Sequence, residues 1–151
     1  MKLYKLLIIG LLCSQNLISQ ENHFGLGVIL GDPTGLSAKL RLNNANAVDG
    51  ALAWSATGLH VHSDYLWDNE NFFTNRNQNF DLYYGIGGRL ISLSSDAYKN
   101  QTSIAVRAPI GINYKIRNTQ VQIFAEMALN FSFSPRSDVD LDAGVGLRFY
   151  F

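Results

Sequence analysis

Apolar and polar residues alternate strictly along the last thirteen residues of the chain. Odd positions from Val139 to Phe151 are all apolar, whereas even positions from Asp140 to Tyr150 are polar or glycine. A period of two places each set on its own face of a β-strand. Strands of soluble sheets are usually about 5–6 residues long, whereas a strand needs about 9–11 residues to cross a bilayer at a tilt. The pattern therefore predicts a membrane-spanning strand.

Seven earlier segments show the same alternation and are separated by turns or polar linkers. They are residues 24–31, 36–42, 47–54, 59–67, 80–93, 102–116 and 120–133. Short links between consecutive strands favour an antiparallel meander. Eight is the smallest usual strand count of outer-membrane barrels, and side chains fill the interior of a barrel of this size. We predict an all-β fold, an eight-stranded antiparallel up-and-down transmembrane β-barrel that comprises residues 21–151.

The charged residues of these segments all belong to the polar face. Alternation alone does not say which face of a barrel points outward. A charge on the lipid face costs about 2–4 kcal/mol at the bilayer midplane, and the apolar face carries none. We therefore expect the apolar face to meet lipid and the polar face to form a neutralised network in the lumen. This expected network consists of Lys39, Arg41, Asp49, His60, His62, Asp64, Asp81, Arg89, Arg107, Lys115, Glu126, Asp140, Asp142 and Arg148.

Aromatic residues of the apolar face gather near the strand ends. With both termini on the periplasmic side, one group falls at that end of the barrel: Tyr65, Trp67, Phe80, Tyr84, Tyr114, Phe149 and Phe151. A second group falls at the outer end: Trp54, Phe131 and Phe133. Two belts of outward aromatic residues are typical of the interfacial girdles of membrane barrels.

The N-terminus has the layout of a secretory signal peptide. A short basic segment, residues 1–5, precedes an apolar run at 6–12 and a more polar stretch at 13–20. Cys13 raises the question of a lipoprotein anchor, but Leu12 before it is not a small residue. If Cys13 leaves with a signal peptide of residues 1–20, the mature chain has no cysteine. Disulfides and thiolate chemistry are then excluded.

Composition adds little to this picture. Twelve basic and twelve acidic residues balance, and charged residues make up 16% of the chain, against about 25% in soluble proteins. A balanced charge does not favour a polyanionic partner, so we expect no binding to nucleic acid.

The C-terminal ending Gly146-Leu-Arg-Phe149-Tyr-Phe151 resembles the β-signal of outer-membrane proteins, although Gly144 stands where a polar residue is more usual. Four further segments look like a bacterial family of small outer-membrane β-barrels of uncharacterised function. They are Leu30-Gly-Asp-Pro-Thr-Gly-Leu-Ser37, Asp49-Gly-Ala-Leu-Ala-Trp54, His60-Val-His-Ser-Asp-Tyr-Leu66 and Tyr83-Tyr-Gly-Ile-Gly-Gly-Arg89. More distantly, the chain is similar to OmpA-type and OmpX-type barrels. The resemblance implies a location in the bacterial outer membrane and a barrel fold, but no activity.

The expected function is that of an integral outer-membrane barrel with a polar lumen filled by side chains. Its role would be structural or one of surface interaction, without catalysis or a cofactor. Its partners would be outer-membrane lipids and the barrel assembly machinery, the latter recognising Gly146, Phe149 and Phe151, and we expect a monomer. One alternative is a barrel that binds or transports small solutes or an apolar ligand. Another is an enzyme that modifies lipid A.

Three residues at alternate positions, His60, His62 and Asp64, face the lumen together and have the chemistry of metal ligands. A lumen hydrogen-bond network with arginine or lysine of neighbouring strands is the favoured explanation, and we expect no metal. A lipid A-modifying enzyme would need serine and histidine on the lipid face. Ser63 points outward there, but the two histidines point inward, so no dyad forms on this strand.

Two features are unusual for a barrel. Pro109 lies in the middle of a predicted strand, where every backbone donor should be paired, and we expect a β-bulge there. The longest predicted loop, residues 68–79, falls on the periplasmic side, where connections are normally short.

Overall fold

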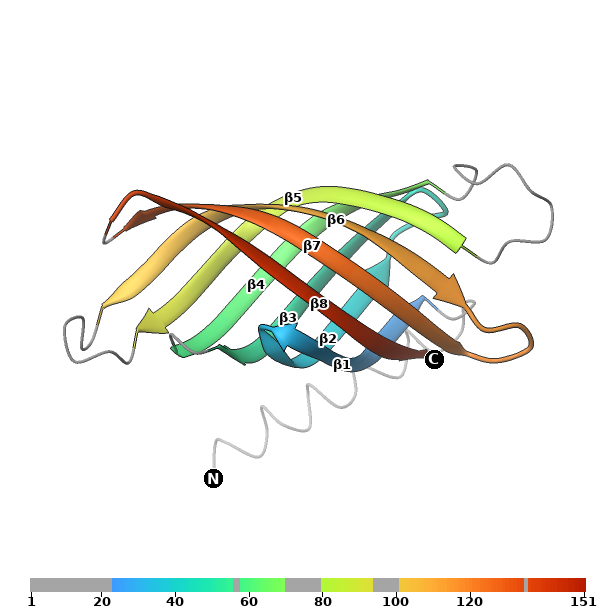
Figure 1. Cartoon of the computed structure of the whole chain (residues 1–151). Helices are drawn as coiled ribbons and strands as arrows, with labels where there is room; N and C mark the ends of the chain where they lie inside the picture. Colours follow the sequence, from blue (N-terminus) through green and yellow to red (C-terminus); the bar gives the residue numbers. More distant parts are fainter. Residues whose placement is uncertain (1–22, 56–57, 70–79, 94–100, 135) are drawn as a thin grey trace, which may run out of the picture.

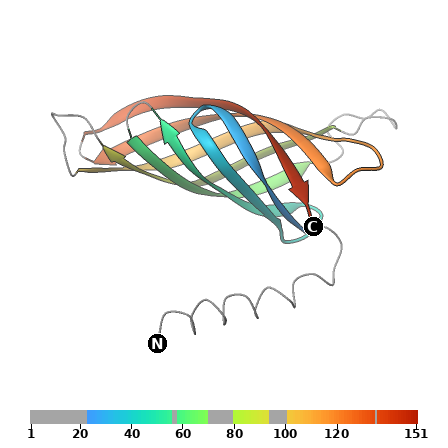
Figure 2. The ribbon, with the colours of Figure 1, turned by 90° about the horizontal axis from the view of Figure 1, so that it is seen from below.

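The protein is described by a computed structural model that covers residues 23–55, 58–69, 80–93, 101–134 and 136–151. Eight strands follow one another along the chain, and each pairs antiparallel with the next (Figure 1). The last strand pairs with the first and closes the barrel (Figure 2). The strands are β1 (Phe24–Asp32), β2 (Thr34–Arg41), β3 (Asn46–Ser55), β4 (Gly58–Asn69), β5 (Phe80–Leu93), β6 (Thr102–Lys115), β7 (Val121–Ser134) and β8 (Asp138–Tyr150). The predicted eight-stranded up-and-down barrel is confirmed.

Some of the sequence expectations concern residues that the structure does not describe. The signal peptide at 1–20 and Cys13 lie outside the described residues, as do positions 70–79 of the longest loop and 94–100 of the next. Among the described residues, no helix has the length and apolar character needed to cross a membrane.

The two faces of the strands differ sharply in chemistry. Large apolar side chains point outward, for example Leu30 and Met127, which are 58% and 51% exposed. Charged side chains point inward, and Lys39 and Arg107 are 0% and 1% exposed. This is the reverse of a water-soluble barrel, which buries apolar side chains inside. The arrangement suits a hydrocarbon environment outside the barrel.

The wall of the barrel is uneven in height. Strands β1 and β2 have 9 and 8 residues, whereas β5, β6 and β7 have 14 each. Pairing between β1 and β8 reaches only Asp32 and Ala143, although β8 begins at Asp138. At the barrel end opposite the termini, the β1–β2 hairpin therefore extends less far than the hairpins of the longer strands, as Figure 1 shows.

The expected bulge at Pro109 is wrong. Pro109 pairs in register with Ala128 of β7. On the other side, β5 and β6 keep one register above and below the proline, and only the pairing at positions 85 and 86 is missing. The donor that proline lacks thus faces β5, and the ladder tolerates its loss without an extra residue. The irregularity lies instead between Ile104 and Ala105, where Phe133 is the additional residue of β7.

The even strand count places both termini at one end of the barrel. The connections β2–β3, β4–β5 and β6–β7 lie at that same end. The longest connection therefore leaves from the terminal end, as the sequence predicted. Strand β4 continues to Asn69, two residues beyond its predicted end.

Candidate functional site: the charged lumen

Arg107 of β6 occupies the centre of the lumen. Its guanidinium pairs with Asp64 of β4, lies 2.6 Å from Glu126 Oε1 of β7, and has its Nε 3.7 Å from Asp142 Oδ2 of β8. The Tyr83 hydroxyl donates a 2.8 Å hydrogen bond to the other Glu126 oxygen. One buried cation therefore links strands from opposite walls. Burial of such a charge is tolerated only when it is paired and hydrogen-bonded.

A second arginine, Arg148 of β8, crosses the lumen toward β2 and β3. It donates to Asp49 Oδ2 at 2.9 Å and to Ser37 Oγ at 3.0 and 2.8 Å. The guanidinium carbon also lies 3.9 Å from the centroid of the Phe124 ring, a cation–π contact. A Cβ at Gly146 would collide with that ring, so glycine at this position makes the stacking possible.

Arg89 of β5 binds the carboxylates of the network that lie nearest the barrel end opposite the termini. Its two terminal nitrogens donate to the two oxygens of Asp140 at 2.7 and 2.6 Å, and one also reaches Asp142 at 3.1 Å. Asn130 donates to Asp140 at 2.9 Å. Asp140 and Asp142 therefore pair mainly with Arg89, and Asp142 also lies near Arg107, whereas Arg148 pairs with Asp49.

Two lysine pairs lie nearer the end that carries the termini. Lys39 is 2.8 Å from Asp68, and both side chains are buried. Lys115 is 2.9 Å from Asp81, but the Lys115 side chain is 39% exposed. The first pair is enclosed in the barrel, whereas the lysine of the second is partly exposed to solvent.

Aromatic and polar side chains meet inside the barrel at this end. The Arg41 guanidinium carbon lies 5.2 Å from the centroid of the Tyr150 ring. The Tyr150 hydroxyl donates to Gln122 Oε1 at 2.9 Å. A pocket of about 150 Å³ opens beside these residues and Lys115. Side chains thus occupy the interior, as an eight-stranded barrel allows.

His60, His62 and Asp64 face the lumen from one strand. His60 Nε2 lies 3.0 Å from His62 Nδ1, and the two rings meet edge to face at 5.1 Å. His62 Nε2 lies 3.9 Å from Asp64 Oδ2, beyond hydrogen-bond distance. The histidine pair is therefore held together, and the second nitrogen of His62 faces the carboxylate region.

Several described residues contribute to the network but were not in the predicted set, among them five with different chemistry: Ser37, Asp68, Tyr83, Phe124 and Asn130. Asp68 continues the inward alternation of β4 but was assigned to a loop because asparagines follow it. Phe124 is buried at an inward position although its chemistry suits the lipid face. Position in the alternation marks all five, whereas residue type alone does not.

The aromatic residues named above point outward at the two ends of the barrel. At the end that carries the termini, several rings pack against each other. The distances between ring centroids are 5.2 Å for Tyr65 and Trp67, 5.8 Å for Trp67 and Tyr84, 4.7 Å for Phe80 and Tyr114, and 5.0 Å for Phe149 and Phe151. At the opposite end the exposed rings are Trp54, Phe131 and Phe133.

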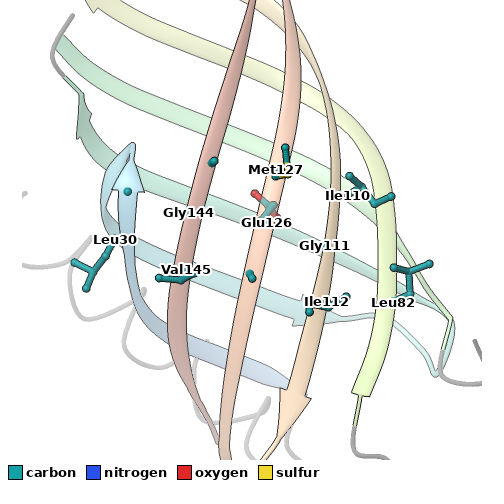
Figure 3. Close-up of a pocket in the computed structure, with 12 residues that line it drawn as sticks. Leu30, Leu82, Ile110, Gly111, Ile112, Glu126, Met127, Gly144 and Val145 are labelled. Carbon is teal, nitrogen blue, oxygen red and sulfur yellow. The ribbon is translucent and has the colours of Figure 1, made fainter. Parts of the chain in front are cut away.

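The outer face also carries a shallow recess of about 580 Å³ across β6, β7 and β8. Small residues at Ala125 and Ala143 leave this space. In Figure 3, Leu30 and Val145 lie on one side of it and Ile110 on the other. Its apolar lining suits an acyl chain of a surrounding lipid.

Comparison with family models gives no match, and comparison with curated proteins also finds none. Among solved structures, the chain is similar to the N-terminal β-barrel domain of OprF from Pseudomonas aeruginosa. The two share 14% identity with a TM-score of 0.60, and the match covers 85% of this chain and 95% of that one. At this identity the likeness concerns the fold, a closed antiparallel β-barrel.

Proposed function

We propose that this chain is an integral barrel of the bacterial outer membrane with a structural or surface-interaction role and no catalysis. The observation that carries the proposal is the inverted chemistry of its walls. Lys39, Arg107 and Arg148 are enclosed and paired, while the outer face is apolar. In water such a molecule would expose its apolar face and gain nothing from its interior charges.

The remaining parts of the proposal follow from the same surface. Outer-membrane lipids cover the apolar band, and the aromatic rings lie at its two borders. The assembly machinery recognises β8 through Gly146, Phe149 and Phe151. A closed barrel leaves no unpaired sheet edge along most of its wall, which favours a monomer.

Conductance in planar bilayers separates this proposal from a transport role. The arginine network fills the lumen, so the reconstituted barrel should give no stable unitary current steps. A porin reconstituted in the same way serves as the positive control. Reproducible unitary steps from the purified chain would contradict a filled lumen and favour small-solute transport.

Mass spectrometry of lipid A tests the enzymatic alternative. On β4, Ser63 is exposed on the outer face while His60 and His62 are buried inside. Lipid A from cells that express the chain should match that from control cells. A change in acylation that disappears in the Ser63→Ala variant would show catalysis and overturn the proposal.

A further inference from the structure

We propose that the lumen binds one divalent transition-metal ion, Zn²⁺ in the first instance, between Asp49, His62 and Asp64. One ligand atom from each residue lies within 4.8 Å of the other two. All three residues are buried, at 3%, 5% and 1% exposure. This trio differs from the one that the sequence suggested, because Asp49 of β3 takes the place of His60.

The strand register brings the two carboxylates together. Asp49 and Asp64 are direct partners across β3 and β4, and both point into the lumen. Like charges at directly opposite positions destabilise a strand pair. His62 precedes Asp64 by two residues and shares its inward face. A cation between the three side chains would turn this repulsion into attraction.

Each carboxylate has one oxygen that an arginine occupies and one that remains unsatisfied. Asp49 Oδ2 accepts from Arg148, and Asp64 Oδ2 accepts from Arg107. Within the described part of the chain, Oδ1 of each aspartate is buried without a hydrogen-bond partner. A buried polar atom without a partner is costly. A metal ligand bond would satisfy such an oxygen.

The two histidines are placed so that His62 can bind the metal and His60 can accept a hydrogen bond from His62. When His62 Nδ1 donates to His60 Nε2, 3.0 Å away, His62 Nε2 carries a lone pair on the side of the carboxylates. Ligating histidines almost always donate the N–H of their other ring nitrogen to a carboxylate, a backbone carbonyl or water, which fixes the tautomer and ring orientation. Here the His60 ring would take the place of that acceptor. His60 is therefore a positioning residue and His62 a ligand.

Within the network, the cluster of carboxylates around three arginines carries more negative than positive charge and leaves room for a divalent cation. Three arginines, Arg89, Arg107 and Arg148, are joined to five carboxylates, an excess of two negative charges. The carboxylates are Asp49, Asp64, Glu126, Asp140 and Asp142. The count leaves out Arg41 and the two neutral lysine pairs, Lys39–Asp68 and Lys115–Asp81. One divalent ion neutralises that excess. One imidazole with two carboxylates is a ligand set that suits Zn²⁺.

The test uses the full chain, expressed without a histidine tag and extracted from membranes in mild detergent. Because the site is enclosed, the protein is also unfolded and refolded in detergent at buffered free Zn²⁺ concentrations, and bound metal is measured by mass spectrometry. We expect one equivalent per barrel. His60→Gln should weaken binding about 10–100-fold, as loss of a supporting partner does, and His62→Gln should weaken it further.

Two matched variants control for adventitious binding. Asp81→Asn removes a lumen carboxylate that pairs with Lys115, and His23→Gln removes the histidine outside the network; both should bind Zn²⁺ like the wild type. Refolding with Co²⁺ gives a readout that needs no variant, because coordination by nitrogen and oxygen changes its visible absorption from that of the hydrated ion.

Two results would overturn the proposal. One is a wild-type barrel that refolds without Zn²⁺ and leaves Co²⁺ with the spectrum of the hydrated ion, as expected if protons neutralise the carboxylates instead. The other is equal Zn²⁺ binding by the wild type and by folded His62→Gln. If His62→Gln does not refold, Asp49→Asn provides the same comparison.

Discussion

At the scale of single residues, the stability of this barrel depends on guanidinium groups that water does not reach. Arg107 and Arg148 are each enclosed and each shared between strands that are distant in sequence. A buried ion pair adds little net stability over an apolar pair of the same volume, but loss of one partner leaves the other charge buried and uncompensated. Removal of one partner of these ion pairs should therefore lower the free energy of unfolding strongly.

The Arg107→Gln substitution tests this expectation. It leaves Asp64 and Glu126 without their cation and should lower the free energy of unfolding by about 3–5 kcal/mol. Urea unfolding in detergent, followed by tryptophan fluorescence, measures the change. Lys115→Gln is the matched control, because it breaks a half-exposed pair with Asp81 that is worth about 0–1 kcal/mol. Equal losses in the two variants would contradict a buried network.

A charge on the outer face should be costly in a way that depends on depth. Met127 lies at the middle of β7, and Met127→Arg should cost about 2–4 kcal/mol in lipid vesicles. Val139 lies at the outer rim on β8, where Val139→Arg should cost only about 0–1 kcal/mol. Unfolding titrations in vesicles measure both. A soluble barrel would tolerate the two substitutions alike, since both side chains would be in water.

The sequence was sufficient to place these residues inside or outside but not to pair them. Alternation assigned Arg89 and Asp140 to the lumen, yet it carried no information on their partners across the barrel. Arg148 and Asp49 are 99 positions apart, and their pairing depends on how far each strand is staggered against the next. Phe124 was missed because an apolar residue at an inward position looks like a lipid-facing one.

At the scale of one element, β8 serves both packing and the proposed recognition by assembly machinery. Gly146 makes room for the Phe124 ring, which supports Arg148. Phe149 and Phe151 contact each other on the outer face. The glycine of the predicted signal therefore has a structural reason in the folded barrel, whereas the terminal phenylalanine points away from the lumen.

Two substitutions, one in β8 and one directly after it, distinguish packing from recognition. Phe151→Ala should lower the amount of barrel in the outer membrane of cells, while the purified chain refolds in detergent like the wild type. Gly146→Ala should lower both the amount of barrel in the outer membrane and the refolding yield, because the added Cβ collides with the Phe124 ring. Immunoblots of membrane fractions and refolding yields measure the two effects. Equal loss of refolding in both variants would contradict a recognition role for Phe151.

Strand existence was predictable because each strand alternates over many residues, but local irregularities were not. Pro109 suggested a bulge, yet only its missing donor disturbs the ladder toward β5. The bulge at Phe133 carries no glycine or proline to mark it. Strand β4 was predicted to end at Trp67 because residues 68–79 are polar, whereas Asp68 is held in the lumen by Lys39.

At the scale of the whole molecule, closure makes the barrel a single cooperative unit. Every strand pairs with two neighbours, so no strand can leave without breaking two ladders. We expect the unboiled protein to migrate in a detergent gel at a position different from that of the boiled protein. Identical migration, or absence from detergent extracts of the outer membrane, would contradict a folded membrane barrel.

The uneven wall has a consequence for the surrounding bilayer. Strands β5 to β7 exceed β1 by five residues, which amounts to about 13 Å along the barrel axis at a rise of about 3.3 Å per residue and a tilt of about 40°. A rigid cylinder with one low side cannot match a lipid layer of constant thickness around its whole circumference. Acyl chains beside the β1–β2 hairpin are therefore compressed, or the cylinder leans until the mismatch is shared.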